Sequence, residues 1–133
     1  MLKKTMTYVD FDGNSRTEDF YFNLTKAECL EMEMSTNGGL DKFLKKIIDE
    51  QDHTKIFNYM KDFVRMSYGE KSNDGKYFVK NEEALQRFVS TAAYSDLFTE
   101  LATNAKAAAE FMNGVIPQEY APTVASALET HSA

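Results

Sequence analysis

Disulfides and long apolar stretches are missing from this sequence. Cys29 is its single cysteine, so no intramolecular disulfide can form, and a reducing compartment such as the cytoplasm is expected. No apolar run approaches the ~20 residues that cross a bilayer. The first residues, Met1 to Thr5, include two lysines but lack the apolar stretch of a signal peptide. These absences favour an intracellular protein that folds without covalent cross-links.

Basic residues are too few to balance the acidic ones. Fifteen Lys and Arg face 21 Asp and Glu, which gives a formal net charge of −6. This negative charge repels phosphate backbones and anionic lipid, so neither nucleic acid nor a membrane is an expected partner. There is no tryptophan, but ten Phe and seven Tyr are available for a core. At 133 residues the chain is long enough for one compact domain and short for two.

The N-terminal segment has the pattern of a β-hairpin, which we place at residues 4–23. Residues 4–11 alternate between two faces and are rich in β-branched and aromatic types. The Asp-Gly-Asn sequence at 12–14 suits a tight turn, and residues 16–22 resume the extended pattern. Because a lone hairpin is marginal in water, one aromatic face must be covered by helices or by a second subunit.

A helix start follows directly. Thr25 and Glu28 have the T-x-x-E spacing of a capping box, in which each side chain bonds the backbone N–H of the other residue. Leu24 before the cap and Cys29 four residues after it form a potential hydrophobic staple. The sequence therefore predicts a sharp change from strand to helix at Thr25.

Helical periodicity then assigns faces to this first helix. Ala27, Leu30 and Met34 recur at helical spacing and predict its buried stripe. Met32 falls away from that stripe. Since methionine is adaptable and common on surfaces that accept apolar partners, Met32 is a candidate contact.

Four or five further helices are predicted. Residues 40–50 carry an apolar stripe, and a third helix is expected from Asp52 through Tyr68, ended by Gly69. Residues 67–76 read as a long ordered loop before a short extended piece at 77–79. Three more residues are predicted N-caps of the remaining helices: Asn81, Ser95 and Thr103. The last of these helices is expected to end at Gly114.

These elements predict an α+β fold that is mainly α. We expect a single globular domain over residues 1–116, in which the hairpin 4–23 is followed by a compact bundle of five to six short helices over 25–114. Residues 117–133 are small and polar, with a second proline and no periodicity, so we expect a flexible C-terminal tail.

No set of residues has the spacing of a catalytic, cofactor or metal site. The acidic stretch starting at Asp10 lacks the calcium-loop pattern, because Gly falls at position four and Tyr21 at position twelve. His53 near a helix start reads as a surface histidine. Cys29 has no neighbouring histidine to activate it and reads as a packing residue. We therefore expect a protein that is not an enzyme and needs no cofactor.

Three stretches carry a resemblance to a known family: YFNLTKAECLEMEMS, SYGEKSNDGKYFVK and AYSDLFTELATNAKAAAEFMNGVIP. From about Thr7 to Pro117 the sequence resembles the tail assembly chaperones of long-tailed, siphophage-type bacteriophages of Gram-positive hosts. The resemblance implies a non-catalytic protein that binds the tape-measure protein and keeps it soluble during tail tube polymerisation. It also implies location in the host cytoplasm, absence from the mature virion and, in some members, a frameshifted longer form that recruits the tail tube protein.

Two other classes stay open on the sequence alone. A structural virion component, such as a minor tail or head–tail connector protein, would also be small and acidic. A small enzyme would need scattered Asp and Glu residues to converge with His53 in a cleft.

A partner-binding surface is predicted among the helices between Leu40 and Phe63, where apolar side chains are dense. The candidate residues, with Met32 added, are Met32, Phe43, Leu44, Ile47, Phe57, Met60 and Phe63. A homo-oligomer is also expected, because an open hairpin edge near the aromatic residues 20–22 invites pairing with a second copy.

Overall fold

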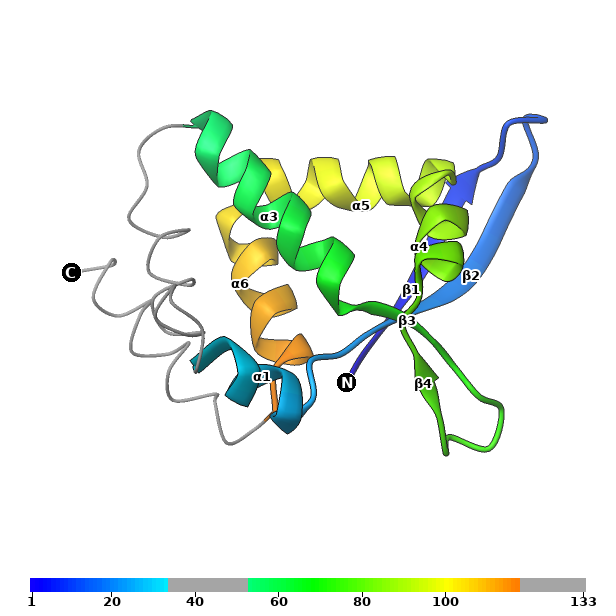
Figure 1. Ribbon diagram of the computed structural model, residues 1–133. Helices are drawn as coiled ribbons and strands as arrows, with labels where there is room; N and C mark the ends of the chain where they lie inside the picture. Colours follow the sequence, from blue (N-terminus) through cyan, green and yellow to red (C-terminus); the bar gives the residue numbers. More distant parts are fainter. Residues whose placement is uncertain (34–52, 118–133) are drawn as a thin grey trace.

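The computed structural model describes residues 1–33 and 53–117, and the structural statements below refer to those residues. The elements follow the order β1 (Leu2–Val9), β2 (Ser15–Phe22), α1 (Lys26–Glu33), α3 (His53–Ser67), β3 (Tyr68–Lys71), β4 (Phe78–Val79), α4 (Glu82–Val89), α5 (Ala92–Thr103) and α6 (Ala105–Val115) (Figure 1). The α+β, mainly helical fold predicted from the sequence is confirmed, with the hairpin at its N-terminus. The predicted helix at 40–50 and nearly all of the predicted tail lie outside the described residues. None of the described helices has the length and apolarity needed to span a membrane.

The N-terminal hairpin forms as its alternation predicts. β1 and β2 pair antiparallel from Leu2 opposite Phe22 to Val9 opposite Ser15, and Gly13 in the turn has a φ of 84°, which glycine adopts readily. The inward positions of the two strands are apolar near the helices, where Phe20 and Phe22 are buried. The need for helices to cover this face is met, since α5 and α6 both contact β1.

A second hairpin extends this sheet. The short extended piece predicted at 77–79 contains its strand β4, which is confirmed, but β3 was not predicted. Residues 67–76, predicted as a loop, include β3, which pairs with β2, and β4 pairs with β3 in turn, giving the order β1-β2-β3-β4. The helix predicted to reach Tyr68 ends instead at Ser67, whose hydroxyl donates to the carbonyls of Phe63 (2.8 Å) and Val64 (3.1 Å).

Gly69 explains why the chain turns into a strand at this point. It pairs with Tyr21 of β2, and a Cβ atom placed on it would lie 2.6 Å from the ring of Phe78 and 2.9 Å from the carbonyl oxygen of Val79. The glycine therefore permits a close approach between strands rather than ending a helix. Tyr68 beside it stacks on Phe88 of α4 at 4.2 Å between ring centroids.

The core lies between one face of the sheet and the helices α3 to α6. Phe22 is at its centre, with ring centroids 5.0 Å from Phe111 of α6 and 5.7 Å from Phe88 of α4. Full burial of each such side chain contributes roughly 1.5–3 kcal/mol, so these rings dominate the packing energy. In a chain without tryptophan, phenylalanine rings therefore make the main contacts between the sheet and the helices.

The helix caps are partly those predicted. Asn81 caps α4 as expected, and its side chain accepts from the N–H of the third helical residue. Thr91 caps α5 in place of Ser95, and Asn104 caps α6 in place of Thr103, each by the same bond. Both have extended backbone angles before their helices, which is the conformation an N-cap requires. Asn104 also separates α5 from α6, so the two closing helices do not merge.

Candidate functional site

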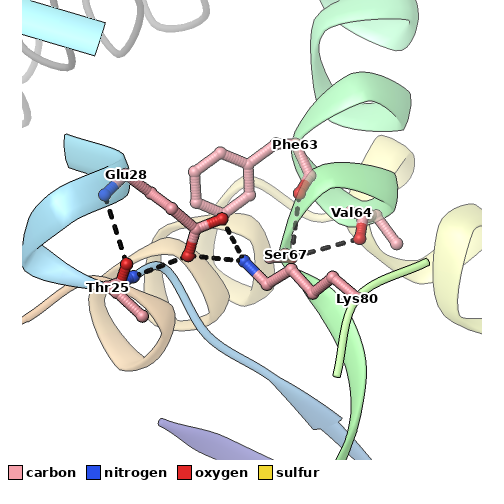
Figure 2. Close-up of polar contacts among 6 residues, drawn as sticks. All are labelled: Thr25, Glu28, Phe63, Val64, Ser67 and Lys80. Carbon is pink, nitrogen blue, oxygen red and sulfur yellow. Dashed lines mark hydrogen bonds and ion pairs between the residues drawn. The ribbon is translucent and has the colours of Figure 1, made fainter. Parts of the chain in front are cut away.

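The junction between β2 and α1 carries the clearest polar arrangement in the described part of the chain. The backbone N–H of Thr25 donates to Glu28 Oε1 (2.9 Å), and the N–H of Glu28 donates to Thr25 Oγ1 (3.2 Å), which confirms the predicted capping box (Figure 2). Lys80, which follows β4, adds Nζ contacts of 2.8 Å and 2.7 Å to the two oxygens of Glu28. One carboxylate therefore caps α1 and ties it to the second hairpin.

The protonation of Glu28 responds to these contacts. Burial of the carboxylate raises its pKa, but hydrogen bonds from Lys80 and Thr25 lower the pKa of Glu28 by more, so it lies below its ordinary value. Glu28 is therefore ionised at neutral pH, which is the form that accepts from Lys80 and Thr25 together. This arrangement stabilises structure and offers no group poised for proton transfer.

The buried face of α1 differs from the predicted one. Ala27 and Leu30 are exposed, Leu30 at 55%, whereas Cys29 is fully buried. The staple position explains the difference, because Leu24 and Cys29 both enter the core and so fix the rotation of the helix. Cys29 is a packing residue, as expected, and Leu30 becomes an exposed apolar side chain.

The predicted partner-binding residues fall into different environments. Met60 and Phe63 belong to the core, at 1% and 0% exposure, so in this fold neither is available to a partner. Phe57 is 46% exposed and rests edge-on against Phe98 of α5, with centroids 4.3 Å apart. Met32 lies in the last turn of α1. The other three, Phe43, Leu44 and Ile47, lie outside the described residues.

The edge predicted for self-association is partly occupied by β3. β2 lies between β1 and β3 in the sheet, and two of its three aromatic residues, Phe20 and Phe22, are buried. Tyr21 is partly buried, and Nζ of Lys71 lies 5.5 Å from its ring centroid. β3 therefore covers the edge of β2 at residues 21 and 22, and self-association of the chain stays a prediction.

Exposed apolar side chains occur on both hairpins at positions that were not among the predicted contact residues. Phe11 is 82% exposed at the tip of the first hairpin, next to Val9 at its side. Tyr77 and Val79 are exposed on the second hairpin. The exposure of Phe11 could have been predicted from its position beside a turn, since turn residues seldom reach a core.

Acidic residues in the turns of the two hairpins have structural roles. Asp10 organises the first turn by accepting from the N–H groups of Asp12 and Asn14. Asp74 does the same for the second, where it accepts from the N–H of Lys76 and the hydroxyl of Ser72. Within residues 1–33 and 53–117, no group of three or more His, Cys, Asp or Glu is placed to hold a metal ion.

Comparison with protein families gives one match. A family model described as a phage tail assembly chaperone matches residues 1–132 of the chain. Comparison with curated proteins and with solved structures found no match. The matched range includes both hairpins and every described helix, and it agrees with the resemblance carried by the three sequence stretches.

Proposed function

Since the chain belongs to the phage tail assembly chaperone family, we propose that it binds the tape-measure protein of its phage and keeps that protein soluble while the tail tube polymerises. The family match over residues 1–132 is the observation that carries this proposal. Binding without catalysis is consistent with the polar arrangement around Glu28, which stabilises the fold and activates no nucleophile. The protein would act in the host cytoplasm and leave before the virion is complete.

Phe57 is a predicted contact residue that lies exposed in the described part of the chain. Its ring lies edge-on against Phe98, so it has a fixed position while about half of its surface stays free for an apolar partner. Rigid aromatic residues contribute strongly to binding, because little conformational entropy is lost on contact. The net charge of −6 would keep a complex with an aggregation-prone client dispersed.

Co-expression with the tape-measure protein of the same phage tests this proposal. We expect the tape-measure protein to move from the insoluble to the soluble fraction and to co-purify with the wild-type chain. Phe57→Asp should reduce co-purification strongly, whereas Tyr77→Asp, at a similarly exposed position on the second hairpin, should not. Tape-measure protein that stays insoluble beside folded wild-type chain would overturn the proposal.

The alternative role, a minor tail or head–tail connector protein, is distinguished by the composition of particles. A chaperone is present in infected cells bound to its client and is missing from purified virions. A structural component remains in virions at a fixed copy number. Quantitative mass spectrometry of both samples separates the two roles, and the same samples would reveal any longer frameshifted form bound to tail tube protein.

A further inference from the structure

The tip of the first hairpin is held rigid by its own hydrogen bonds. Asp10 Oδ1 accepts from the backbone N–H groups of Asp12 and Asn14, both at 2.9 Å, while Asp10 Oδ2 pairs with Arg16 Nε at 2.7 Å. Backbone bonds from Gly13 to Asp10 (3.0 Å) and from Asp10 to Asn14 (2.8 Å) close the turn. None of these bonds uses the side chain of Phe11.

Phe11 is therefore presented to solvent by a fixed backbone. It is 82% exposed, and neither it nor its exposed neighbour Val9 belongs to the core. Figure 1 shows the tip of this hairpin extending past α4, and residues 15–19 of β2 next to the tip are exposed. Single exposed apolar residues are ordinary, but one held on a rigid turn beside a concave surface is typical of an interaction site.

A concave surface is present next to Phe11. A cleft of about 330 Å³ lies between the hairpin and the junction of α4 with α5. The hairpin lines it with two aromatic and three charged residues, which are Tyr8, Phe11, Asp10, Arg16 and Glu18. The junction contributes small residues, which are Ser90, Thr91 and Ala92. The rings of Tyr8 and Phe11 and the small junction residues offer contact for one apolar side chain of a partner, while the charged residues of the lining offer contact for polar groups beside it.

The charge around the cleft indicates the chemistry of that partner. Asp10, Glu18 and Arg16 line the cleft, and Asp12 lies in the turn next to it, so these four residues carry a net charge of −2. Arg16 is already paired with Asp10 and lies 3.9 Å from Glu18, so its charge is largely compensated. The remaining negative charge, like that of the whole chain, attracts a basic partner.

We propose that the hairpin tip is a docking site for a short basic segment of a partner protein, in which one apolar or aromatic side chain is flanked by Lys or Arg. The apolar side chain fills the cleft against Phe11 and Tyr8. The flanking cations pair with the exposed carboxylates of Glu18, in the lining of the cleft, and Asp12, in the adjacent turn. A second copy of this chain is a poorer occupant, because a small acidic tip would meet another acidic tip and bury little area.

This site is separate from the tape-measure contact proposed at Phe57. Phe57 packs on Phe98 in the middle of α5, whereas the cleft adjoins the N-terminal end of that helix. A test of the tip can therefore use a synthetic probe and does not depend on whether the tape-measure protein binds.

The probe is a fluorescent peptide in which lysine alternates with phenylalanine and leucine, titrated into the full-length chain at low salt. Two matched peptides serve as controls, one with glutamate in place of lysine and one with alanine in place of the apolar residues. We expect saturable binding of the basic apolar peptide alone, weakening with salt as exposed charges are screened. Amide shifts in nuclear magnetic resonance spectra should concentrate at Phe11, Asp12 and residues 90–92.

Variants decide whether the tip is the site. Phe11→Ser should weaken binding of the peptide at least tenfold and Asp12→Lys several-fold, while both variants stay folded because the two side chains are exposed. Val79→Ser, an exposed apolar position on the second hairpin, should bind like wild type. Equal binding of the acidic peptide, shifts centred elsewhere, or unchanged affinity in folded Phe11→Ser would each overturn the proposal.

Discussion

Nζ of Lys80 lies 2.8 Å from one carboxylate oxygen of Glu28 and 2.7 Å from the other, although the two residues are 52 positions apart in the chain. Both side chains are partly shielded from solvent, with exposures of 22% for Lys80 and 34% for Glu28. The same Glu28 completes the cap of α1. The carboxylate of Glu28 therefore serves both the local helix cap and the long-range ion pair with Lys80.

Loss of Lys80 should weaken this tie without unfolding the protein. For Lys80→Met we expect the free energy of unfolding to fall by about 1 kcal/mol, since solvent screens a partly exposed pair. Glu28→Gln keeps a side chain that can still accept from Thr25 and should cost a similar amount. Urea unfolding of both variants and the double variant forms a double-mutant cycle, and strictly additive losses would show that the two residues are not coupled.

Acid should remove the contribution of Glu28. Its pKa is lower in the folded chain than the ordinary 4.5, so the unfolded state binds the proton more readily. The stabilisation is present above pH 4.5 and is lost as the pH falls through the lower, folded-state pKa. The stability of wild type should therefore drop more steeply below about pH 5 than that of Glu28→Gln. Parallel pH profiles would contradict this assignment.

The contacts of Glu28 separate what the sequence predicts from what it does not. The Thr25–Glu28 box was predictable because both partners lie within one helical turn, and the same holds for the Asn81 cap and the Gly13 turn. Lys80 could not be assigned to Glu28, because only the folded chain brings the second hairpin to α1. The first hairpin was likewise readable from its alternation, whereas the pairing of β3 with β2 depends on distant residues.

Surface and core assignments failed for a related reason. Helical spacing alone gave Ala27 and Leu30 a buried position, although the entry of Leu24 and Cys29 into the core decided the rotation of α1. Met60 and Phe63 were selected as contacts for their chemistry, but apolar chemistry is the same for a core and for an interface. The exposure of Phe57 becomes visible only once the packing is known.

Gly69→Ala should destabilise the second hairpin. The added methyl group would meet the ring of Phe78 at 2.6 Å and the carbonyl of Val79 at 2.9 Å, so strand β4 must shift. Overpacking of this kind costs roughly 1–3 kcal/mol. Thermal and urea unfolding measure the loss, and combining the change with Phe78→Ala should recover part of it. A wild-type midpoint for Gly69→Ala would show that the strands separate easily.

Phe63 and Phe57 should separate stability from binding. Phe63→Ala removes a fully buried ring and should cost roughly 3–5 kcal/mol of stability. Phe57→Ser removes a half-exposed ring and should cost much less, while still weakening capture of the tape-measure protein. Unfolding curves measured beside co-purification distinguish the two effects. A large stability loss in Phe57→Ser would mean that its contact with Phe98 mainly supports the fold.

Cys29 allows the fastening of α1 to be measured directly. It is the single cysteine of the chain and is fully buried, so a thiol reagent such as Ellman's reagent reacts with it only when α1 opens. If opening is fast compared with labelling, the rate follows the population of the open form. Lys80→Met should then label roughly five times faster than wild type, because about 1 kcal/mol corresponds to that factor.

Phe11→Ser, remote from α1, should label at the wild-type rate. Equal rates in Lys80→Met and wild type would show that burial of Leu24 and Cys29, and not the pair with Glu28, holds α1 in place.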